Sequence, residues 1–246
     1  AVMPGKGRIV VFGASGNVGL PCIKALSASL AKEASPAFDV HAVSRNPPVL
    51  EEKLGGGLPG VEIVQGDILD GASLSKVLAG ADRFFFCLPS HLPGSEMRAH
   101  SNAVADAAVA CGVRHCVRLS SLNMGAQGAL GEAHEAGEAY MKEKGLTVTS
   151  VRPTSFSTNF GFMRADVLER SHFSLLSKGA VNWVATEDIA AVSARALLDA
   201  SLDGRTLDVT GPPDSTLTPE GMQKLLSEKM GRDIVYQPSP SPPPAD

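Results

Sequence analysis

A short apolar run that leads directly into a glycine-rich turn is the feature that most constrains how this chain folds. Residues 8–12 read Arg-Ile-Val-Val-Phe, which is typical of a parallel strand buried on both faces. Gly13, Gly16 and Gly19 follow at a three-residue spacing, and a helical stretch begins at about Val18. The sequence therefore predicts a strand, a tight turn and a helix in direct succession.

The same alternation of strand and helix continues to about residue 151 and predicts the fold class. Further strands are expected at 38–43, 61–65, 83–88, 113–119 and 147–151, and helices at 71–79, 95–111 and 131–144. Several helices stop at a glycine, where a left-handed residue is needed: Gly80, Gly112, Gly145 and later Gly231. This pattern predicts an α/β protein with a doubly wound parallel sheet, the Rossmann fold.

Beyond Arg152 the alternation loosens, which predicts a small C-terminal α+β lobe. Helices are expected at 158–170, 186–200 and 219–230, and strands at 173–176, 205–210 and 233–236. Residues 238–244 hold five prolines, which is typical of an extended or disordered tail. We expect a dinucleotide-binding core over 1–152, a substrate-side lobe over 153–236 interleaved with the core, and a Pro-rich tail over 237–246.

The composition argues against several classes of partner. The 246 residues carry a net charge of −4 and no run of Lys or Arg, whereas nucleic-acid surfaces are basic. The longest strongly apolar stretch, 84–88, is too short to span a bilayer. No signal peptide is evident, and four cysteines without metal-ligand spacing read as reduced thiols. We expect a cytoplasmic protein without a metal. A location in an organelle is the alternative, because Ala1 is consistent with a removed presequence.

The glycine triplet indicates a dinucleotide, because a pyrophosphate binds where unpaired N–H groups and the helix dipole face it. An ordinary Gly-rich turn is the alternative. Ser44 and Arg45 end the second strand, and a guanidinium beside a hydroxyl suits a 2′-phosphate, so NADP(H) is favoured over NAD(H). Asp39 stands at the start of that strand, more than about 10 Å from the cofactor edge. Arg45 as a solvated loop residue is the alternative, and Lys53 would assist from a Pro/Gly-rich loop.

Eight short motifs follow one another along roughly residues 8–200. They are GASGNVG at 13–19, SRNP at 44–47, GDILD at 66–70, CGV at 111–113, LSS at 119–121, His134-x3-Glu138, SVRP at 150–153 and EDIA at 187–190. In this order they resemble the NmrA-like branch of the atypical short-chain dehydrogenase/reductases. The resemblance implies an NAD(P)(H)-binding domain with a small lobe over the nicotinamide. Members of this branch include NADPH-dependent quinone oxidoreductases and redox-sensing regulators.

Carried over by position, the resemblance implies cofactor contacts at successive strand ends. The glycine turn would contribute Gly13, Ser15, Gly16, Asn17, Val18 and Gly19, and the next strand end Ser44 and Arg45. Asp67 and Ile68 would flank the adenine, and Cys87, Leu88 and Pro89 would line the cofactor. Ser120, Ser121 and His134 would lie near the nicotinamide, with Pro153, Thr154 and Phe156 beside it. The chain departs from its relatives in a shortened 122–133 segment and an early Pro-rich end. The shorter tail would leave the substrate pocket more open.

The Tyr-x3-Lys dyad of typical short-chain reductases is absent from its usual place. Tyr140 and Lys144 match the spacing but stand at the C-terminal end of their helix, on the edge opposite the cofactor. Counting back from Arg152 places His134 at the lysine position and Leu130 at the tyrosine position.

His134 and Ser120 are therefore the candidate catalytic residues. His134 would act as a general acid near neutral pH or as a polar residue that only positions substrate. Ser120 would contact a carbonyl oxygen. Glu138 would orient His134 or face solvent.

Two functions fit these observations. The first is an NADP(H)-dependent oxidoreductase that passes hydride directly to a quinone or related small carbonyl compound, with a proton from water or His134. The second is a non-catalytic NAD(P)(H)-binding redox sensor that acts through a protein partner, which the missing dyad favours. An isomerase or dehydratase is weaker, since such enzymes generally need the tyrosine. The partner is expected to be a small-molecule substrate; a homodimer or a regulatory protein partner stays open.

Overall fold

The computed structural model describes residues 6–34, 36–89, 92–175 and 179–238, and the chain divides into two compact units. The first unit comprises Ala1–Pro153 and Thr186–Val209, and the second comprises Thr154–Ala185 and Thr210–Asp246. Most of the expected Pro-rich tail, residues 239–246, lies outside the described residues.

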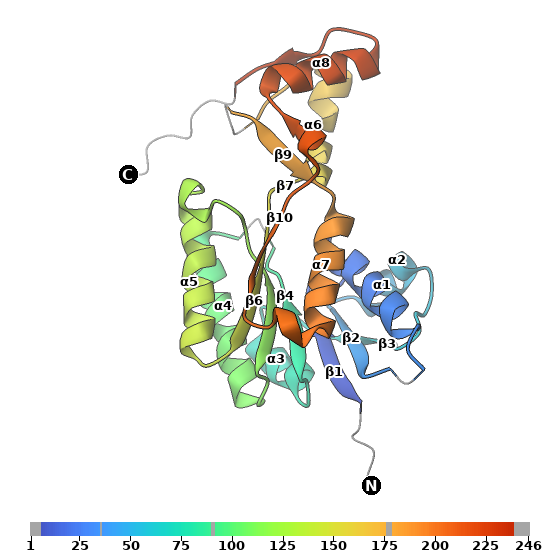
Figure 1. The fold of residues 1–246 in the computed structure, drawn as a ribbon, viewed down its shortest axis with the longest axis vertical. Coiled ribbons are helices and arrows are strands. Elements are labelled where there is room, and N and C mark those ends of the chain that lie inside the picture. The colour runs from blue at the N-terminus through green and yellow to red at the C-terminus, as the bar shows by residue number, and fades with distance from the viewer. Residues whose placement is uncertain (1–5, 35, 90–91, 176–178, 239–246) are drawn as a thin grey trace. The chain divides into compact units, whose positions relative to one another are not determined.

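The first unit is built on a seven-stranded sheet in which every neighbouring pair of strands is parallel (Figure 1). Its strands are β1 (Gly7–Val11), β2 (Phe38–Ser44), β3 (Val61–Gln65), β4 (Arg83–Phe86), β5 (His115–Leu119), β6 (Thr147–Pro153) and β10 (Thr206–Val209). The strand order is β10-β6-β5-β4-β1-β2-β3. This confirms the predicted doubly wound sheet, and the order reverses between β1 and β4, where such folds bind ligands.

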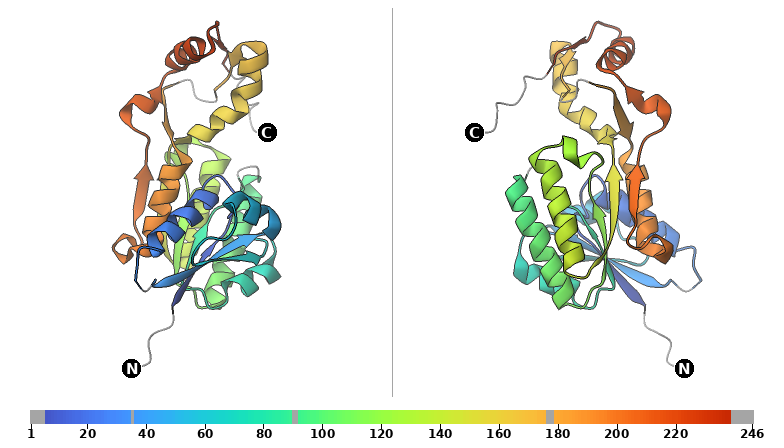
Figure 2. Two further views of the ribbon diagram at one scale, coloured as in Figure 1. Left: turned by 90° about the vertical axis from the view of Figure 1, so that its right-hand side faces the viewer. Right: turned by 60° about the vertical axis from the view of Figure 1, so that its left-hand side comes forward.

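Helices cover both faces of this sheet, as Figure 2 shows. On one face α1 (Gly19–Leu30) contacts α7 (Thr186–Leu198) and α2 (Pro47–Leu54). On the other, α4 (Gly94–Ala110) packs between α3 (Gly71–Leu78) and α5 (Ala129–Glu143). None of the helices in the described part of the chain is both long and apolar enough to cross a membrane.

The core of the first unit explains why its strands are so uniformly apolar. Ile9, Val10 and Val11 of β1 and Phe84 of β4 have no exposed surface, because both faces of these strands are covered. Phe12 and Phe84 pack edge to face with ring centroids 6.3 Å apart.

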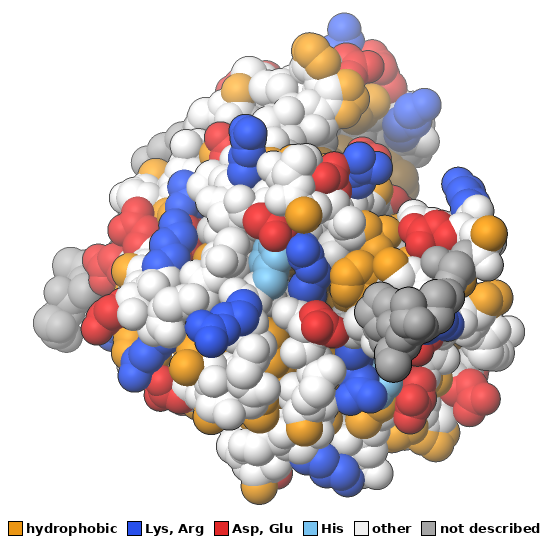
Figure 3. All heavy atoms as spheres, turned by 60° about the horizontal axis from the view of Figure 1, so that its bottom comes forward, with side chains coloured by type: hydrophobic (Ala, Val, Ile, Leu, Met, Phe, Trp, Pro, Cys, Tyr) orange, Lys and Arg blue, Asp and Glu red, His pale blue; other side chains and the backbone are white. Residues whose placement is uncertain are grey.

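The surface around the lower end of this unit in Figure 1 carries basic and acidic side chains interspersed (Figure 3).

The second unit has its own sheets and core. Its strands are β7 (Ser155–Phe156), β9 (Val181–Val184) and β11 (Thr216–Leu217) in one sheet, and β8 (His172–Phe173) with β12 (Val235–Tyr236) in another. Its helices are α6 (Phe160–Ala165), which continues into a π-helical turn at Asp166–Arg170, and α8 (Pro219–Met230). Trp183 packs on Phe160, with ring centroids 4.5 Å apart, and belongs to this core.

Short 3-10 turns complete the fold and lie at Met124–Ala126, Ser157–Asn159, Ala200–Leu202 and Pro213–Ser215. The left-handed glycines expected after four helices are confirmed, with φ between +64° and +86° at Gly80, Gly112, Gly145 and Gly231. Thr218 caps α8 by accepting a hydrogen bond from the Gly221 N–H. The strand expected at 173–176 is confirmed only as His172–Phe173, and residue 176 lies outside the described residues.

Helix α2 is an element that the sequence interpretation missed. The expectation that Lys53 lies in a Pro/Gly-rich loop was wrong, because residues 47–54 form this helix. Pro47 and Pro48 occupy its first turn, where proline is compatible with a helix, and Gly55 ends it with a φ of +76°. Two leucines, Leu50 and Leu54, bury its inner face.

Candidate functional site

The turn between β1 and α1 leaves no room for a side chain at two of its three glycines. A Cβ on Gly13, whose φ is +66°, would lie 2.3 Å from the Sγ of Cys87. A Cβ on Gly19 would lie 2.1 Å from the carbonyl oxygen of Gly13. The Gly16 N–H donates to that same carbonyl over 2.9 Å. The glycines therefore fix a tight turn that brings the start of α1 against the end of β1.

Helix α1 begins without a side-chain cap and without an acidic residue in its first turn, whereas Asp70 caps α3 and Thr218 caps α8. The Leu20 N–H donates to the Gly16 carbonyl oxygen over 3.1 Å, and Pro21 has no N–H. The Gly19 N–H and the positive dipole end of α1 are thus available to an external anion. Lys53 Nζ donates to the Ser15 carbonyl oxygen over 3.2 Å, which brings a cation beside the turn. Ser15, Gly16 and Asn17 are exposed, while Val18 and Gly19 are buried. This cradle fits the pyrophosphate of a dinucleotide.

Arg45 follows the end of β2 and is exposed. It makes no hydrogen bond or ion pair with any residue that the structure describes, so its guanidinium is available to a ligand. Ser44 beside it is buried, and its hydroxyl accepts from the Asn46 N–H over 3.1 Å.

Asp67 and Ile68 follow the end of β3. The Asp67 N–H donates to the Ser73 hydroxyl over 2.8 Å, and its carboxylate accepts from the Leu69 N–H over 3.0 Å. The side chain of Ile68 packs against the core. These bonds shape the loop at the carboxyl end of β3, near the edge predicted for the adenine.

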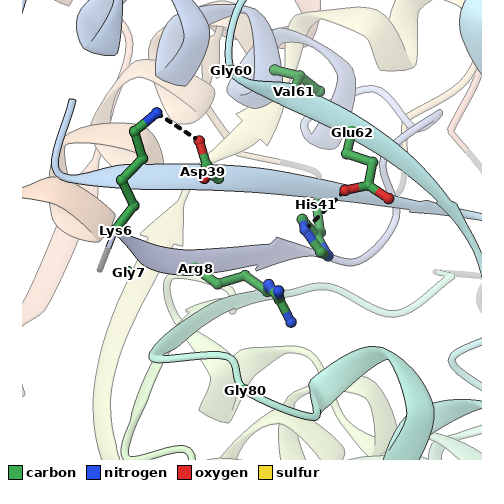
Figure 4. Close-up of a pocket in the computed structure, with 9 residues that line it drawn as sticks. All are labelled: Lys6, Gly7, Arg8, Asp39, His41, Gly60, Val61, Glu62 and Gly80. Atoms are coloured by element: carbon green, nitrogen blue, oxygen red, sulfur yellow. Dashed lines mark hydrogen bonds and ion pairs between the residues drawn. The ribbon is translucent and has the colours of Figure 1, made fainter. Parts of the chain in front are cut away.

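A polar hollow of about 380 Å³ lies at the opposite edge of the sheet (Figure 4). Lys6 pairs there with Asp39 at 3.1 Å and His41 with Glu62 at 3.3 Å, and the Arg8 guanidinium donates to the Ala79 carbonyl oxygen over 2.8 Å. Asp39 therefore lies at the amino ends of the strands, as predicted. Dinucleotides bind outside the carboxyl ends, so this hollow is separate from the candidate nucleotide site.

Cys87 follows β4 and packs beneath the glycine turn. Its thiol donates to the Phe12 carbonyl oxygen over 3.7 Å, and burial raises the pKa of Cys87 to about 12. The thiol is therefore neutral at physiological pH. Leu88 and Pro89 continue from it and are half-buried.

Ser120 and Glu138 form a buried pair where β5 ends. The Ser120 N–H donates to Val151 of β6, and its hydroxyl donates to Glu138 Oε1 over 2.6 Å. Arg152 Nη2 donates to Glu138 Oε2 over 2.7 Å. Burial alone would raise the pKa of Glu138, but the hydrogen bonds from Arg152 and Ser120 outweigh it and hold that pKa below its ordinary value. The Ser120 proton is thus directed at a carboxylate rather than at a ligand.

His134 lies one turn before Glu138 on α5. Its Nδ1 is buried and has no hydrogen-bond partner among the described residues. Burial, assisted by the Arg118 charge, lowers the pKa of His134 to about 4, so the imidazole is neutral at pH 7. Glu138 neither faces solvent nor hydrogen-bonds to His134, so the two roles expected of it were wrong. Its carboxylate instead holds Ser120 and Arg152.

Ser121 and Pro153 complete the strand ends of the first unit. The Ser121 hydroxyl accepts from Gln127 Nε2 over 2.7 Å. Pro153 ends β6, and its carbonyl oxygen accepts from the Leu122 N–H over 3.0 Å. Thr154 and Phe156 belong to the second unit: the Thr154 hydroxyl bonds to Asn182 Oδ1 over 2.9 Å, and Phe156 pairs with Val184.

Tyr140 and Lys144 are tied to the outer face of α4 and α5. The Tyr140 hydroxyl and Lys144 Nζ both bond to Asp106 Oδ1, over 3.1 Å and 3.0 Å. They stand at the C-terminal end of α5, which ends at Glu143. Their predicted position away from the carboxyl edge is confirmed, and this pair is not the usual dyad.

Arg118 is the residue near this site that sequence reasoning overlooked. It lies in β5 two residues before Ser120 and is only 1% exposed. A charged residue inside an otherwise apolar strand is a signal that could have found it. No group of three or more His, Cys, Asp or Glu that could hold a metal occurs in the described ranges.

A parallel doubly wound sheet with a glycine-shaped, uncapped helix start at its switch point defines a dinucleotide-binding protein of the Rossmann class. The model of the NmrA-like family matches residues 5–243, and the chain belongs to this family.

Similar proteins support the same class. The chain is 31% identical to a (4-alkanoyl-5-oxo-2,5-dihydrofuran-3-yl)methyl phosphate reductase from Streptomyces griseus, over 93% of this chain and 76% of the relative. It is 26% identical to quinone oxidoreductase 2 of Escherichia coli, over 93% and 77%. The structure of an NADPH-dependent quinone oxidoreductase from E. coli with NADPH matches with a TM-score of 0.78 and 25% identity, over 94% and 78%. These likenesses support an oxidoreductase that binds a nicotinamide dinucleotide.

Proposed function

We propose that this protein is an NADP(H)-dependent oxidoreductase that reduces a quinone or related small carbonyl compound by direct hydride transfer. The observation that carries the proposal is the cradle at the uncapped start of α1, where Gly13 and Gly19 admit no Cβ. Reductases among the relatives support the reaction class. The bound dinucleotide would supply the hydride.

The proposed preference for NADP(H) depends on Arg45. Its guanidinium is exposed and has no partner in the described part of the chain. It would bind the 2′-phosphate on the adenosine ribose of NADP(H). Lys53 adds a second cation near the turn. Replacing Arg45 by Ala should weaken NADPH binding and leave NADH binding nearly unchanged. If the ratio of the NADPH affinity to the NADH affinity is the same before and after the replacement, Arg45 does not bind the 2′-phosphate.

The remaining cofactor contacts are proposed by position. Asp67 and Ile68 would flank the adenine. Cys87, Leu88 and Pro89 would line the middle of the cofactor. Ser120, Ser121 and His134 would lie near the nicotinamide, with Pro153, Thr154 and Phe156 beside it.

A quinone or activated carbonyl suits the side chains near the proposed nicotinamide position. The Ser120 hydroxyl donates to Glu138, and His134 is neutral, so neither group holds a readily transferred proton at pH 7. Quinones accept hydride without prior protonation, and water can protonate the product afterwards. The chemistry therefore has no need of a Tyr-Lys dyad.

Turnover of NADPH with a panel of quinones and small carbonyl compounds tests the reaction, followed by the loss of cofactor absorbance. We expect turnover with at least one quinone. Tight NADPH binding without turnover across the panel would instead support the second candidate, a redox sensor acting through a protein partner. That candidate is favoured by the absence of the usual dyad, because Leu130 and His134 stand at the positions expected for its tyrosine and lysine.

We propose a cytoplasmic location, and the free thiols of Cys22, Cys87, Cys111 and Cys116 support it, because thiols stay reduced in that compartment.

A further inference from the structure

Arg118 carries a buried charge that has no carboxylate within ion-pair distance in the described part of the chain. Its guanidinium lies over the Phe86 ring, 4.9 Å from the centroid, and Nη1 donates to the Ser101 hydroxyl over 3.3 Å. Nε has no hydrogen-bond partner among the described residues. A buried charge left partly unpaired is costly, so the field of this guanidinium acts strongly on nearby polar groups.

Helix α5 is shaped around this guanidinium. A Cβ on Gly137 would lie 2.7 Å from Arg118 Nη2, so the absence of a side chain there lets the helix approach. His134, Gly137 and Glu138 are three and four residues apart and share one face of α5. Since Gly137 meets Arg118 and Glu138 meets Ser120, His134 faces the same strand one turn nearer the start of the helix.

The charged groups that act on His134 come from two elements. Arg118 of β5 disfavours its protonation, and Glu138 of α5 favours it. The charge of Glu138 is already balanced by Arg152 of β6. The positive field of Arg118 therefore dominates, and it favours a lone pair over an N–H at the buried Nδ1.

We propose that Arg118 is a positioning residue that holds His134 as the neutral tautomer with its proton on Nε2, so that Nε2–H donates to the substrate oxygen. This inference rests on the proposed reductase function. When the quinone or carbonyl substrate accepts the hydride with its electron pair, negative charge moves onto the substrate oxygen. The Nε2–H bond stays intact and only hydrogen-bonds to the oxygen. A water molecule then gives the proton that completes the product and leaves as hydroxide.

Nitrogen NMR of protein labelled at the histidine ring tests the tautomer without turnover. In the wild-type protein the ring of His134 should remain neutral, with its proton on Nε2, from pH 8 down to about pH 5. In Arg118→Met the pKa of His134 should rise, although burial, the largest cause of its depression, still holds it below the ordinary value of about 6.5. The Nδ1–H tautomer should become populated. Arg118→Lys keeps the charge and should restore the wild-type titration. His41, whose pKa is lowered by burial and Arg8, is the internal control and should not move.

Kinetics test whether the tautomer matters to the reaction. His134→Asn supplies a neutral N–H donor and should retain most of kcat, whereas His134→Leu should lose about 100-fold in kcat.

The inference is overturned by a wild-type His134 that is protonated at pH 6, or that carries its proton on Nδ1. It is equally overturned by an unchanged titration in Arg118→Met; if that variant does not fold, the wild-type spectrum alone decides. If the protein turns over no quinone, the reductase proposal is refuted. The NMR experiment still tests the proposed tautomer of His134, because it does not depend on turnover.

Discussion

Gly19 has the least freedom of the residues in the nucleotide turn, because its neighbour is backbone rather than a flexible side chain. In Gly19→Ala the new Cβ would meet the Gly13 carbonyl oxygen at 2.1 Å, so the turn itself must shift. We expect a loss of about 1–3 kcal/mol in the free energy of unfolding and at least about a tenfold weaker Kd for NADPH. Calorimetry and cofactor titration measure both.

The matched control is Gly57→Ala, because a Cβ there meets no atom within 4 Å. Its stability should equal that of the wild type or rise slightly, with an unchanged Kd for NADPH. An unchanged Kd in Gly19→Ala as well would show that this turn does not hold the pyrophosphate.

Glu138 makes stability depend on pH. Its pKa is depressed in the folded state, so its stabilising effect is complete above its unfolded pKa of about 4.3 and is lost as the pH falls through the lower folded pKa. Glu138→Gln leaves Arg152 without its charge partner, and because the Arg152 side chain is 27% exposed, we expect a cost of about 1–3 kcal/mol at pH 7. This cost should shrink toward pH 3 in chemical unfolding experiments.

The exposed carboxylate Glu62 provides the comparison for Glu138. Glu62→Gln should change the free energy of unfolding by less than about 0.5 kcal/mol, since that side chain is 71% exposed. A pH-independent cost in Glu138→Gln would mean that the charge of Glu138 does not stabilise the fold.

At the scale of elements, the central strands could be predicted because parallel strands covered on both faces require continuous apolar runs. The strand at Val61–Gln65 has the predicted limits, and α8 begins after its predicted cap. Helix α2 was missed because Pro47 and Pro48 suggest a break, although proline is compatible with a first turn. Only the tertiary packing of Leu50 and Leu54 marks this stretch as a helix.

Asn182 of β9 joins several segments of the second unit. Its Oδ1 accepts from the Gly211 N–H over 2.8 Å, and its Nδ2 donates to the Thr216 hydroxyl over 2.9 Å. Asn182→Ala removes these bonds together, and we expect a loss of about 2–3 kcal/mol. Hydrogen exchange at the Gly211 amide should accelerate, while the amides of β1 keep their protection. Thr216→Ala, which removes only one of these bonds, should have a clearly smaller effect.

At the scale of the whole molecule, the gathering of the candidate site could be predicted from topology alone. Parallel strands place Gly13, Arg45, Cys87 and Ser120 at one edge of the sheet, wherever each lies in the sequence. The bonds of these side chains could not be predicted in the same way. The spacing His134-x3-Glu138 defines a helix face, but it does not reveal that this face meets a buried arginine.

Cofactor binding should stabilise the folded chain, because a ligand that binds only the native state shifts the unfolding equilibrium. At about 100 times its Kd, NADPH should add about 2.7 kcal/mol and raise Tm by about 5–10 °C. NADH at the same concentration should raise Tm much less, since it lacks the 2′-phosphate that Arg45 would bind. In Arg45→Ala the two cofactors should give nearly equal shifts, with the unliganded Tm unchanged because Arg45 is exposed and makes no hydrogen bond or ion pair among the described residues. Equal shifts in the wild type would show instead that the site does not distinguish the two nucleotides.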